Sequence, residues 1–181
     1  MVTLESLHRQ YDIDTANVKI RGRSFRFFKA RSLDRFIDSQ DIFKDFPLWT
    51  KLWEASLVLA DHLAGLKVKE GKTFLELGCG SGSLSEVVCR RFPHAASIQL
   101  VDFSGKLLEQ CQRRLAEFRN VAYREEDFRV LDLAPRSVDL IVSSISLHHL
   151  THKEKADLFA KVYRWLDHPG IFSYSDQFRG A

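Results

Sequence analysis

The sequence is short of the features that mark membrane, secreted and disulfide-bonded proteins. No apolar run approaches the roughly 20 residues that a membrane-spanning helix needs, and the first residues, MVTLESLHRQYDID, contain no apolar signal-peptide core. Three cysteines are present, without C-x-x-C spacing, at Cys79, Cys89 and Cys111. An odd number of cysteines with this spacing is typical of reduced thiols. We therefore expect a cytoplasmic protein with no membrane partner.

A strong excess of charge of one sign is also lacking. The chain has 27 lysines and arginines against 24 aspartates and glutamates, a formal net charge of +3. A charge this small does not by itself indicate nucleic-acid binding. The 181 residues, 45% of them hydrophobic and 28% charged, are enough for one globular domain with a substantial core.

The stretch FLELGCGSGSLS, residues 74–85, is the most informative part of the chain. Residues 73–77 are apolar enough for a buried parallel strand, and a helix is expected just beyond the glycines, with Ser81 or Ser83 as its cap. The glycines between strand and helix leave bare backbone against which a ligand can lie. The start of the helix adds free N–H groups and the positive end of its dipole.

The glycines alternate as G-x-G-x-G, at Gly78, Gly80 and Gly82. This spacing differs from the G-x-G-x-x-G fingerprint of dinucleotide sites, so hydride chemistry is not expected. A helix over 84–92 and a strand over 96–101 complete a β-α-β unit that ends at Asp102. A carboxylate at this position can accept both hydroxyls of a ribose; the alternative is a capping role with Ser104. Phe103 is placed to stack on an adenine ring.

The same alternation of helices and strands continues along the chain. It predicts a helix over 104–119, strands over 120–124 and 138–143, a helix from about residue 153 that Pro169 and Gly170 close, and a strand over 171–175. The pattern is typical of an α/β fold with a doubly wound, mostly parallel, Rossmann-like sheet.

Residues 1–45 differ from the rest and form an N-terminal arm. Residues 18–36, VKIRGRSFRFFKARSLDRF, interleave basic and aromatic side chains around a glycine, which indicates a β-hairpin. Such a pattern can grip RNA or an acidic substrate; the alternative is a solvated basic face with phenylalanines packed on the domain. Residues 46–181 are expected to form the main domain, which begins with an amphipathic helix over 48–64.

Together these segments resemble the class I S-adenosylmethionine (SAM) dependent methyltransferases. The likeness runs from about residue 46 to 179 and rests on ELGCGSG, LVDFS, REEDF, SSISLHHL and a weaker L-x-x-PG-x-F-x-x-x-D ending. It implies a sheet of order 3-2-1-4-5, SAM as cofactor and S-adenosylhomocysteine as product. The second half is most similar to enzymes that act on small or uncharacterised acceptors. FPLWTKLWEAS, before the glycines, is similar to a group of protein-lysine methyltransferases.

The resemblance also implies which residues bind the cofactor. Asp127 would accept from the adenine amine and the Phe128 N–H would meet a ring nitrogen, unless this is merely a solvated acidic loop. Trp49 and Trp53 would either wall the pocket or pack in the core. The full expected set is Glu76, Gly78, Cys79, Gly80, Gly82, Asp102, Phe103, Asp127, Phe128, Ser143, Trp49 and Trp53.

Two departures from the family pattern bear on the acceptor and on assembly. Residues 143–146, SSIS, are not the N/D-P-P-Y of amine and nucleobase methyltransferases, and they lack the acid and aromatic of the lysine group. The usual strands six and seven do not follow residue 175, so the fifth strand would be an open edge. Either the chain is a fragment, or the basic hairpin or a second subunit in a homodimer covers that edge.

Methyl transfer from a sulfonium depends on positioning and desolvation, so no nucleophile, metal or triad is required. A base helps only when the acceptor carries a proton, and His148 or His149 could serve; packing or helix capping is the alternative. His148 and His152 have i, i+4 spacing, but no H-E-x-x-H motif accompanies them, so no metal site is expected.

The sequence therefore predicts a SAM-dependent methyltransferase (EC 2.1.1) that acts on an unidentified acceptor, with a small molecule favoured. One alternative is a protein or RNA methyltransferase that the basic arm recruits to its acceptor. The other is a SAM-binding scaffold domain without catalytic activity.

Overall fold

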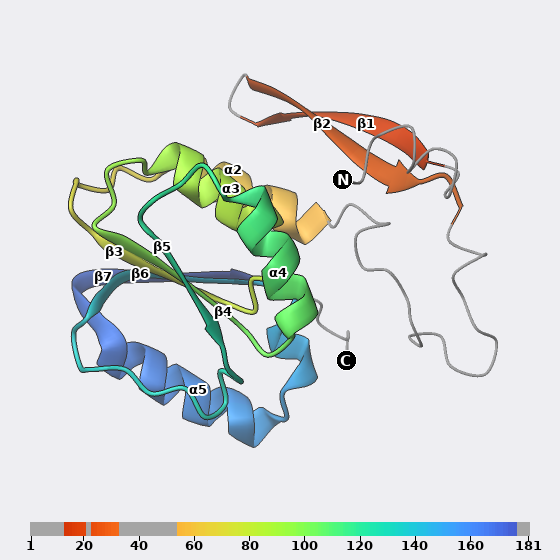
Figure 1. Cartoon of the computed structure of the whole chain (residues 1–181). Coiled ribbons are helices and arrows are strands. Elements are labelled where there is room, and N and C mark those ends of the chain that lie inside the picture. Colours follow the sequence, from red (N-terminus) through yellow and green to blue (C-terminus); the bar gives the residue numbers. More distant parts are fainter. Residues whose placement is uncertain (1–12, 21–22, 33–53, 177–181) are drawn as a thin grey trace. The chain divides into compact units, whose positions relative to one another are not determined.

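The computed structural model describes residues 13–20, 23–32 and 54–176 (Figure 1). The chain divides into two compact units between Glu54 and Ala55. Trp49, Trp53 and the first turns of the predicted helix over 48–64 lie outside the described residues. Within the described residues, no helix combines the length and apolar character needed to cross a membrane.

The first unit contains the predicted hairpin. Strand β1 (Ile13–Ile20) pairs with β2 (Arg23–Ala30) in an antiparallel register that joins Ile20 to Arg23 at the turn and Ile13 to Ala30 at the open end. The two strands form a sheet of their own. The hairpin is confirmed, whereas its role and the predicted domain boundary at residue 45 stay predictions.

The second unit is built on a five-stranded parallel sheet of order β5-β4-β3-β6-β7. Its strands are β3 (Thr73–Leu77), β4 (Ser97–Asp102), β5 (Val121–Glu125), β6 (Val138–Ser144) and β7 (Leu166–Ser175). Counted from β3 as the first strand of this sheet, the order is the predicted 3-2-1-4-5. The doubly wound, Rossmann-like α/β fold is thereby confirmed.

Helices cover both faces of the sheet. They are α2 (Glu54–Gly65), α3 (Ser83–Arg91), α4 (Gly105–Arg114) and α5 (His152–Trp165), with a short 3-10 turn, η3, at Leu147–His149. Figure 1 shows α2, α3 and α4 on one side of the sheet and α5 on the other. Because every connection between parallel strands crosses over the sheet, the carboxyl ends of all five strands meet at one edge.

The core forms where apolar strands are covered on both faces. β3 and β6 run through its centre, and Leu75, Leu77 and Ile141 are fully buried. Trp165, at the end of α5, is also fully buried and belongs to the same cluster. Strands buried on both faces read as continuous apolar runs, which is why residues 73–77 and 138–143 were predictable.

Some element ends differ from the predictions. The helix predicted over 104–119 ends at Arg114, and α3 begins after Gly82 with no side-chain cap from either serine. Pro169 and Gly170 do not close the last helix. They lie inside β7, where the pairing shifts between Val138 and Leu140 and leaves extra residues in β7 as a bulge.

Replacing Ile141 by alanine is expected to lower the free energy of unfolding by about 2–5 kcal/mol, because it opens a cavity in the buried centre of β6. Val58→Ala, at a side chain that is 71% exposed on α2, is the matched control and should change the stability by less than about 0.5 kcal/mol. Urea unfolding followed by circular dichroism measures both. Equal losses for the two variants would contradict the assigned core.

Candidate functional site

The glycine loop, residues 78–82, turns the chain from β3 into α3 at the carboxyl edge of the sheet. The N–H groups of Gly78 and Cys79 both donate to the Val101 carbonyl, at 2.9 and 3.0 Å. Gly78, Gly80 and Gly82 all have positive φ angles, of 73°, 54° and 81°. The loop is thus anchored to the end of the neighbouring strand, β4.

Two of these glycines have different surroundings. A Cβ atom at Gly78 would lie 2.2 Å from Ser146 Oγ, so this position is closed by the protein itself. A Cβ atom at Gly80 would meet nothing within 4 Å. Positive φ and open space at Gly80 together leave bare backbone facing outward, which is the arrangement expected where a ligand lies against a glycine.

Asp102 ends β4 and joins the glycine loop to the next loop. Its Oδ2 accepts a hydrogen bond from the Gly80 N–H at 2.8 Å, and its Oδ1 accepts one from the Ser104 N–H at 2.9 Å. The residue is only 5% exposed. A carboxylate offers about four acceptor positions, so two remain after these bonds. The next residue, Phe103, is 73% exposed and presents an aromatic side chain beside the carboxylate.

The loop after β5 carries the predicted adenine-binding pair. Asp127 Oδ1 accepts from the Arg129 N–H and its Oδ2 from Arg129 Nε, both at 2.8 Å. The bond from Arg129 lowers the pKa of Asp127. Phe128 is 8% exposed and packs in the core, with its ring 3.6 Å from a Cβ placed on Gly78. Its backbone N–H donates to no group in the described part of the chain.

Three further members of the predicted set are buried beneath the loop. Glu76 is 3% exposed and accepts from Ser85 Oγ at 2.6 Å, which ties β3 to α3. Burial raises the pKa of Glu76 to about 8. Ser143 Oγ donates to the Leu77 carbonyl at 2.8 Å, and Cys79 is 6% exposed. The contacts described here are all with other parts of the same chain. The predicted contacts of these three side chains with the cofactor stay predictions.

The chain after β6 returns to the glycine loop. Ser146 Oγ donates to the Gly78 carbonyl at 3.2 Å, and the Ile145 N–H donates to the Ser175 carbonyl at 2.9 Å. Ile145 has a φ angle of 52°, which is rare for a β-branched residue and costs on the order of 1–3 kcal/mol. The ends of β3, β6 and β7 are therefore held together at this point.

The two histidines predicted as candidate bases lie in η3, directly after this turn. His148 Nδ1 is 2.6 Å from Asp176 Oδ1, and the His148 N–H donates to Asp176 Oδ2 at 3.0 Å. The rings of His148 and His149 are 4.0 Å apart. Desolvation lowers the pKa of His149, and a positive charge on His148 lowers it further. His152 is the first residue of α5 and is exposed.

The structure thus brings most of the predicted set to one edge of the sheet, while Trp49 and Trp53 lie outside the described residues. Sequence reasoning missed Arg129, Ser146 and Asp176. Asp176 had a signal, because an acid at the end of a parallel strand lies at the ligand-binding edge. The bond of Arg129 to Asp127, two residues earlier, is a local turn that an Asp at this position can form. No periodicity or spacing points to Ser146, whose partner Gly78 is 68 residues away in the chain.

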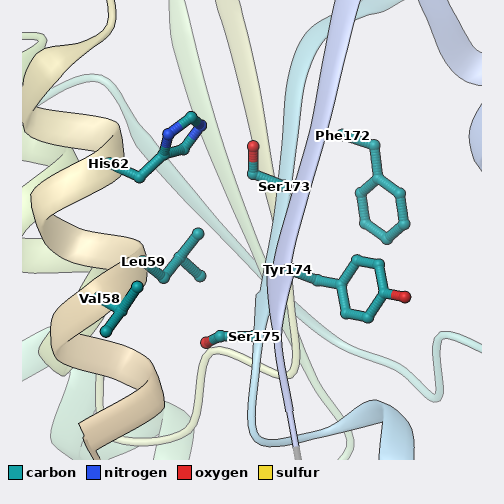
Figure 2. Close-up of a pocket in the computed structure, with 7 residues that line it drawn as sticks. All are labelled: Val58, Leu59, His62, Phe172, Ser173, Tyr174 and Ser175. Atoms are coloured by element: carbon teal, nitrogen blue, oxygen red, sulfur yellow. The ribbon is translucent and has the colours of Figure 1, made fainter.

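A hollow also lies on the surface of the second unit. It has a volume of about 400 Å³ and lies between α2 and β7, lined by Val58, Leu59, His62, Phe172, Ser173, Tyr174 and Ser175 (Figure 2). None of the predicted cofactor residues lines it. One lining residue, Ser175, is bonded to Ile145 in the turn after β6, so the hollow reaches the carboxyl end of β7.

Residues 74–170 match the protein family described as "Methyltransferase domain". Among curated proteins, the chain is 28% identical over 162 residues to a malonyl-[acyl-carrier protein] O-methyltransferase of Marinomonas sp., covering 90% of this chain and 56% of that one. A second relative with this name, from Priestia megaterium, is 33% identical over 106 residues, covering 56% of this chain and 35% of that one. The chain spans about half the length of the first curated relatives it matches.

Solved structures show the same fold. An S-adenosylmethionine dependent methyltransferase from Mesorhizobium loti is 27% identical, with a TM-score of 0.58, and the match covers 68% of this chain and 54% of that one. Phosphoethanolamine N-methyltransferase 1 from Haemonchus contortus is 25% identical, with a TM-score of 0.56 over 63% of this chain and 23% of that one. That structure is a complex with phosphoethanolamine and S-adenosylhomocysteine.

The buried Glu76 predicts how stability depends on pH. Its pKa is about 8 in the folded chain against an ordinary value of 4.5, so between these pH values the unfolded chain binds fewer protons than the folded one. The free energy of unfolding therefore falls as pH rises through this window, by up to about 4 kcal/mol from this group. Glu76→Gln stays neutral and should lack this fall.

Urea unfolding at pH 5 and pH 8 measures the effect as the difference between wild type and variant. Glu109→Gln, at a side chain that is 66% exposed on α4, is the matched control and should retain the wild-type fall. A fall of the same size in Glu76→Gln as in wild type would show that Glu76 is ionised in the folded chain and would contradict the assigned environment.

Proposed function

We propose, from the premise that the chain belongs to the methyltransferase-domain family, that it binds SAM at the glycine loop and transfers a methyl group to an acceptor. The observation that carries this proposal is the bare backbone of Gly80 beside the Asp102 carboxylate. The two groups are joined by one hydrogen bond of 2.8 Å, so they present a single surface to a ligand.

The described residues fit SAM in chemical type. Asp102 has two unused acceptor positions for the two hydroxyls of a ribose. Phe103 offers an exposed aromatic ring to a flat base, and the Phe128 N–H is an unused donor on the neighbouring loop. Asp127 is already bonded to Arg129, so we propose that it accepts the adenine amine through its remaining acceptor positions.

When bound, SAM would supply a methyl group that its sulfonium sulfur activates. The electrons of the bond between that methyl carbon and sulfur would stay on sulfur when the methyl group is transferred. The protein's contribution is to hold and orient the two reactants and to exclude water. The glycine loop, Asp102 and Phe103 would position the cofactor. The turn of residues 144–149, which contacts Gly78 through Ser146, would face the acceptor.

We propose a small molecule as the acceptor. The Haemonchus enzyme, which this chain resembles, is an N-methyltransferase whose structure holds the small molecule phosphoethanolamine. Residues 143–146 lack the motifs that hold planar nitrogens or lysine side chains. We also propose a cytoplasmic location. Its support is that all three cysteines are free and buried, and fractionation of cells that produce the tagged chain tests it.

Asp102→Ala is expected to weaken SAM binding at least roughly tenfold, because hydrogen bonds to a charged group contribute about 1.5–3 kcal/mol each. Isothermal titration with SAM and with S-adenosylhomocysteine measures it. Asp102→Asn keeps one oxygen as an acceptor, so its affinity for SAM should lie between those of the wild type and Asp102→Ala. Asp157→Ala, on the exposed surface of α5, is the control. Wild-type affinity in a folded Asp102→Ala variant would overturn the cofactor assignment.

We also propose that the open edge of the sheet is covered by a second copy of the chain. Within the described residues, β7 pairs with β6 on one side only. Phe172 and Tyr174 project from the face opposite α2 (Figure 2), stack on each other at 5.2 Å and contact Phe159 on α5. Residues 169–175 carry no charge, although charges are what usually protect an exposed edge strand.

The edge is complementary to itself. Two β7 strands related by a twofold axis through Ser173 would run antiparallel, and Phe172 would lie opposite the partner subunit's Tyr174. Aromatic pairs directly across two strands contribute roughly 0.2–1 kcal/mol each. Because a twofold axis repeats every contact, the same aromatic pair forms twice. A second copy thus matches this edge in both strand direction and side-chain chemistry.

Sedimentation equilibrium of the full chain tests this pairing. The wild type is expected to be a dimer, and Tyr174→Lys is expected to shift it to monomer, because a lysine on an edge strand blocks pairing. Tyr163→Lys, at a side chain that is 72% exposed on α5, is the matched control and should remain dimeric. A monomeric wild type, or a dimer that Tyr174→Lys does not weaken, would contradict the proposal.

A further inference from the structure

We propose that Asp176 and His148 form a dyad that accepts a proton from the methyl acceptor, with His148 Nε2 as the base and Asp176 as its positioning residue. This inference rests on the proposed function and deepens it, because it selects one histidine and names a class of acceptor. The acceptor is one whose attacking atom carries a proton at neutral pH, such as a hydroxyl or an ammonium group.

Asp176 holds His148 at two points. The Asp176 side chain is 2% exposed, and its two oxygens contact the ring nitrogen Nδ1 and the backbone N–H of the same residue, at 2.6 and 3.0 Å. A carboxylate accepts hydrogen bonds and does not donate them. Nδ1 must therefore carry the hydrogen, and the neutral ring keeps its lone pair on Nε2.

The other ring nitrogen of His148, Nε2, is accessible. The His148 side chain is 28% exposed, and its only side-chain hydrogen bond with the described residues is the one from Nδ1. Every buried side-chain nitrogen or oxygen of the described residues has a hydrogen-bond partner. Since Nε2 has none, it is not buried, and its lone pair can be reached by a molecule at this edge of the sheet.

The turn after β6 connects the dyad to the glycine loop. Two residues before His148, Ser146 contacts the carbonyl of Gly78 at the start of the glycine loop. Between Ser146 and β6, Ile145 holds a left-handed backbone and bonds to Ser175, the residue before Asp176. Strained backbone persists where surrounding contacts fix it, and it is concentrated at functional sites. The contacts that fix the backbone of Ile145 also connect both members of the dyad to the loop proposed to bind the cofactor.

His149 lacks this arrangement. Its ring lies against His148, at 4.0 Å between centroids, and no carboxylate of the described residues is bonded to either of its nitrogens. In the part of the chain that the structure describes, no hydrogen bond fixes which of its nitrogens carries the hydrogen. Among the described residues, the titratable groups that lie against His148 are His149 and Asp176, and of these two Asp176 is bonded to its ring.

The dyad indicates the class of acceptor. A hydroxyl oxygen would lose its proton as it bonds to the methyl carbon, while the bond from that carbon to the sulfonium sulfur breaks and its electrons stay on sulfur. An ammonium group must lose one proton first, because its nitrogen has no lone pair until then. Nε2 would take that proton, and the resulting imidazolium, held by the Asp176 carboxylate, would release it to water. A carboxylic acid is already ionised at neutral pH and needs no base. A positioned base contributes typically 10²–10⁴-fold to the rate when a proton must be removed.

The decisive experiment reads the hydrogen on His148 directly. Long-range ¹H–¹⁵N spectra of the full ¹⁵N-labelled chain, at a pH where the ring is neutral, distinguish the two tautomers, and His148→Gln identifies the signals. Wild type is expected in the Nδ1–H form. In Asp176→Asn the amide oxygen can still accept the backbone N–H while the amide nitrogen donates to Nδ1, so the ring is expected to switch to the Nε2–H form.

Asp157→Asn is the matched control and should leave the His148 signals unchanged. A wild-type ring in the Nε2–H form would overturn the dyad, because Nε2 would then have no lone pair for a proton. The wild-type spectrum decides this even if Asp176→Asn fails to fold.

Titration of His148→Gln with SAM separates the two proposals: unchanged affinity is expected, and loss of binding would assign His148 to the cofactor site instead.

Transfer of labelled methyl from SAM tests the acceptor class. A panel of alcohols, phenols and amines is compared with a panel of carboxylic acids, and label is expected in the first panel only. His148→Gln should slow that transfer by about 10²–10⁴-fold. Label only in the carboxylic acids, or an unchanged rate in His148→Gln, would overturn the assignment. If wild type does not bind SAM at all, the proposed function fails, while the tautomer result still stands.

Discussion

The hydrogen bond from the Gly80 N–H to Asp102 Oδ2, 2.8 Å long, is the contact on which the proposed site depends. It joins the loop after β3 to the end of β4, and the other oxygen of the same carboxylate holds the next loop through Ser104. Because β3 and β4 are neighbours in the centre of the sheet, the bond lies at the ligand-binding edge of the fold. It leaves bare backbone and unused acceptor positions side by side.

The second half of the edge is organised by a different carboxylate. Asp176, at the end of β7, holds His148 from both its backbone and its ring, and Ser146 connects that turn to Gly78. One carboxylate therefore faces the proposed cofactor site and the other supports the proposed base. Methyl transfer needs two reactants held in fixed geometry. In this proposal the half with Asp102 holds the cofactor, and the half with Asp176 positions the base that faces the acceptor.

The strand order and the glycine loop were predictable, because apolar runs and alternating glycines depend only on nearby sequence. Side-chain partners were not. The bonds that Asp127 accepts from Arg129 and the contact of Asp176 with His148 were not expected, while the role of Asp127 toward adenine stays a prediction. The end of α5 was misplaced because Pro169 and Gly170, which usually end helices, form a bulge in β7 instead. Tertiary pairing decided the partner of His148 and the end of α5, whereas Asp127 and Arg129 are two residues apart and bond locally.

A crystal structure of the chain with S-adenosylhomocysteine tests the central claim most directly, because it shows where the ligand meets the protein. We expect density along the glycine loop, with the two ribose hydroxyls within hydrogen-bonding distance of Asp102 and the adenine beside Phe103. Ligand density elsewhere, or a ribose that does not reach Asp102, would contradict it.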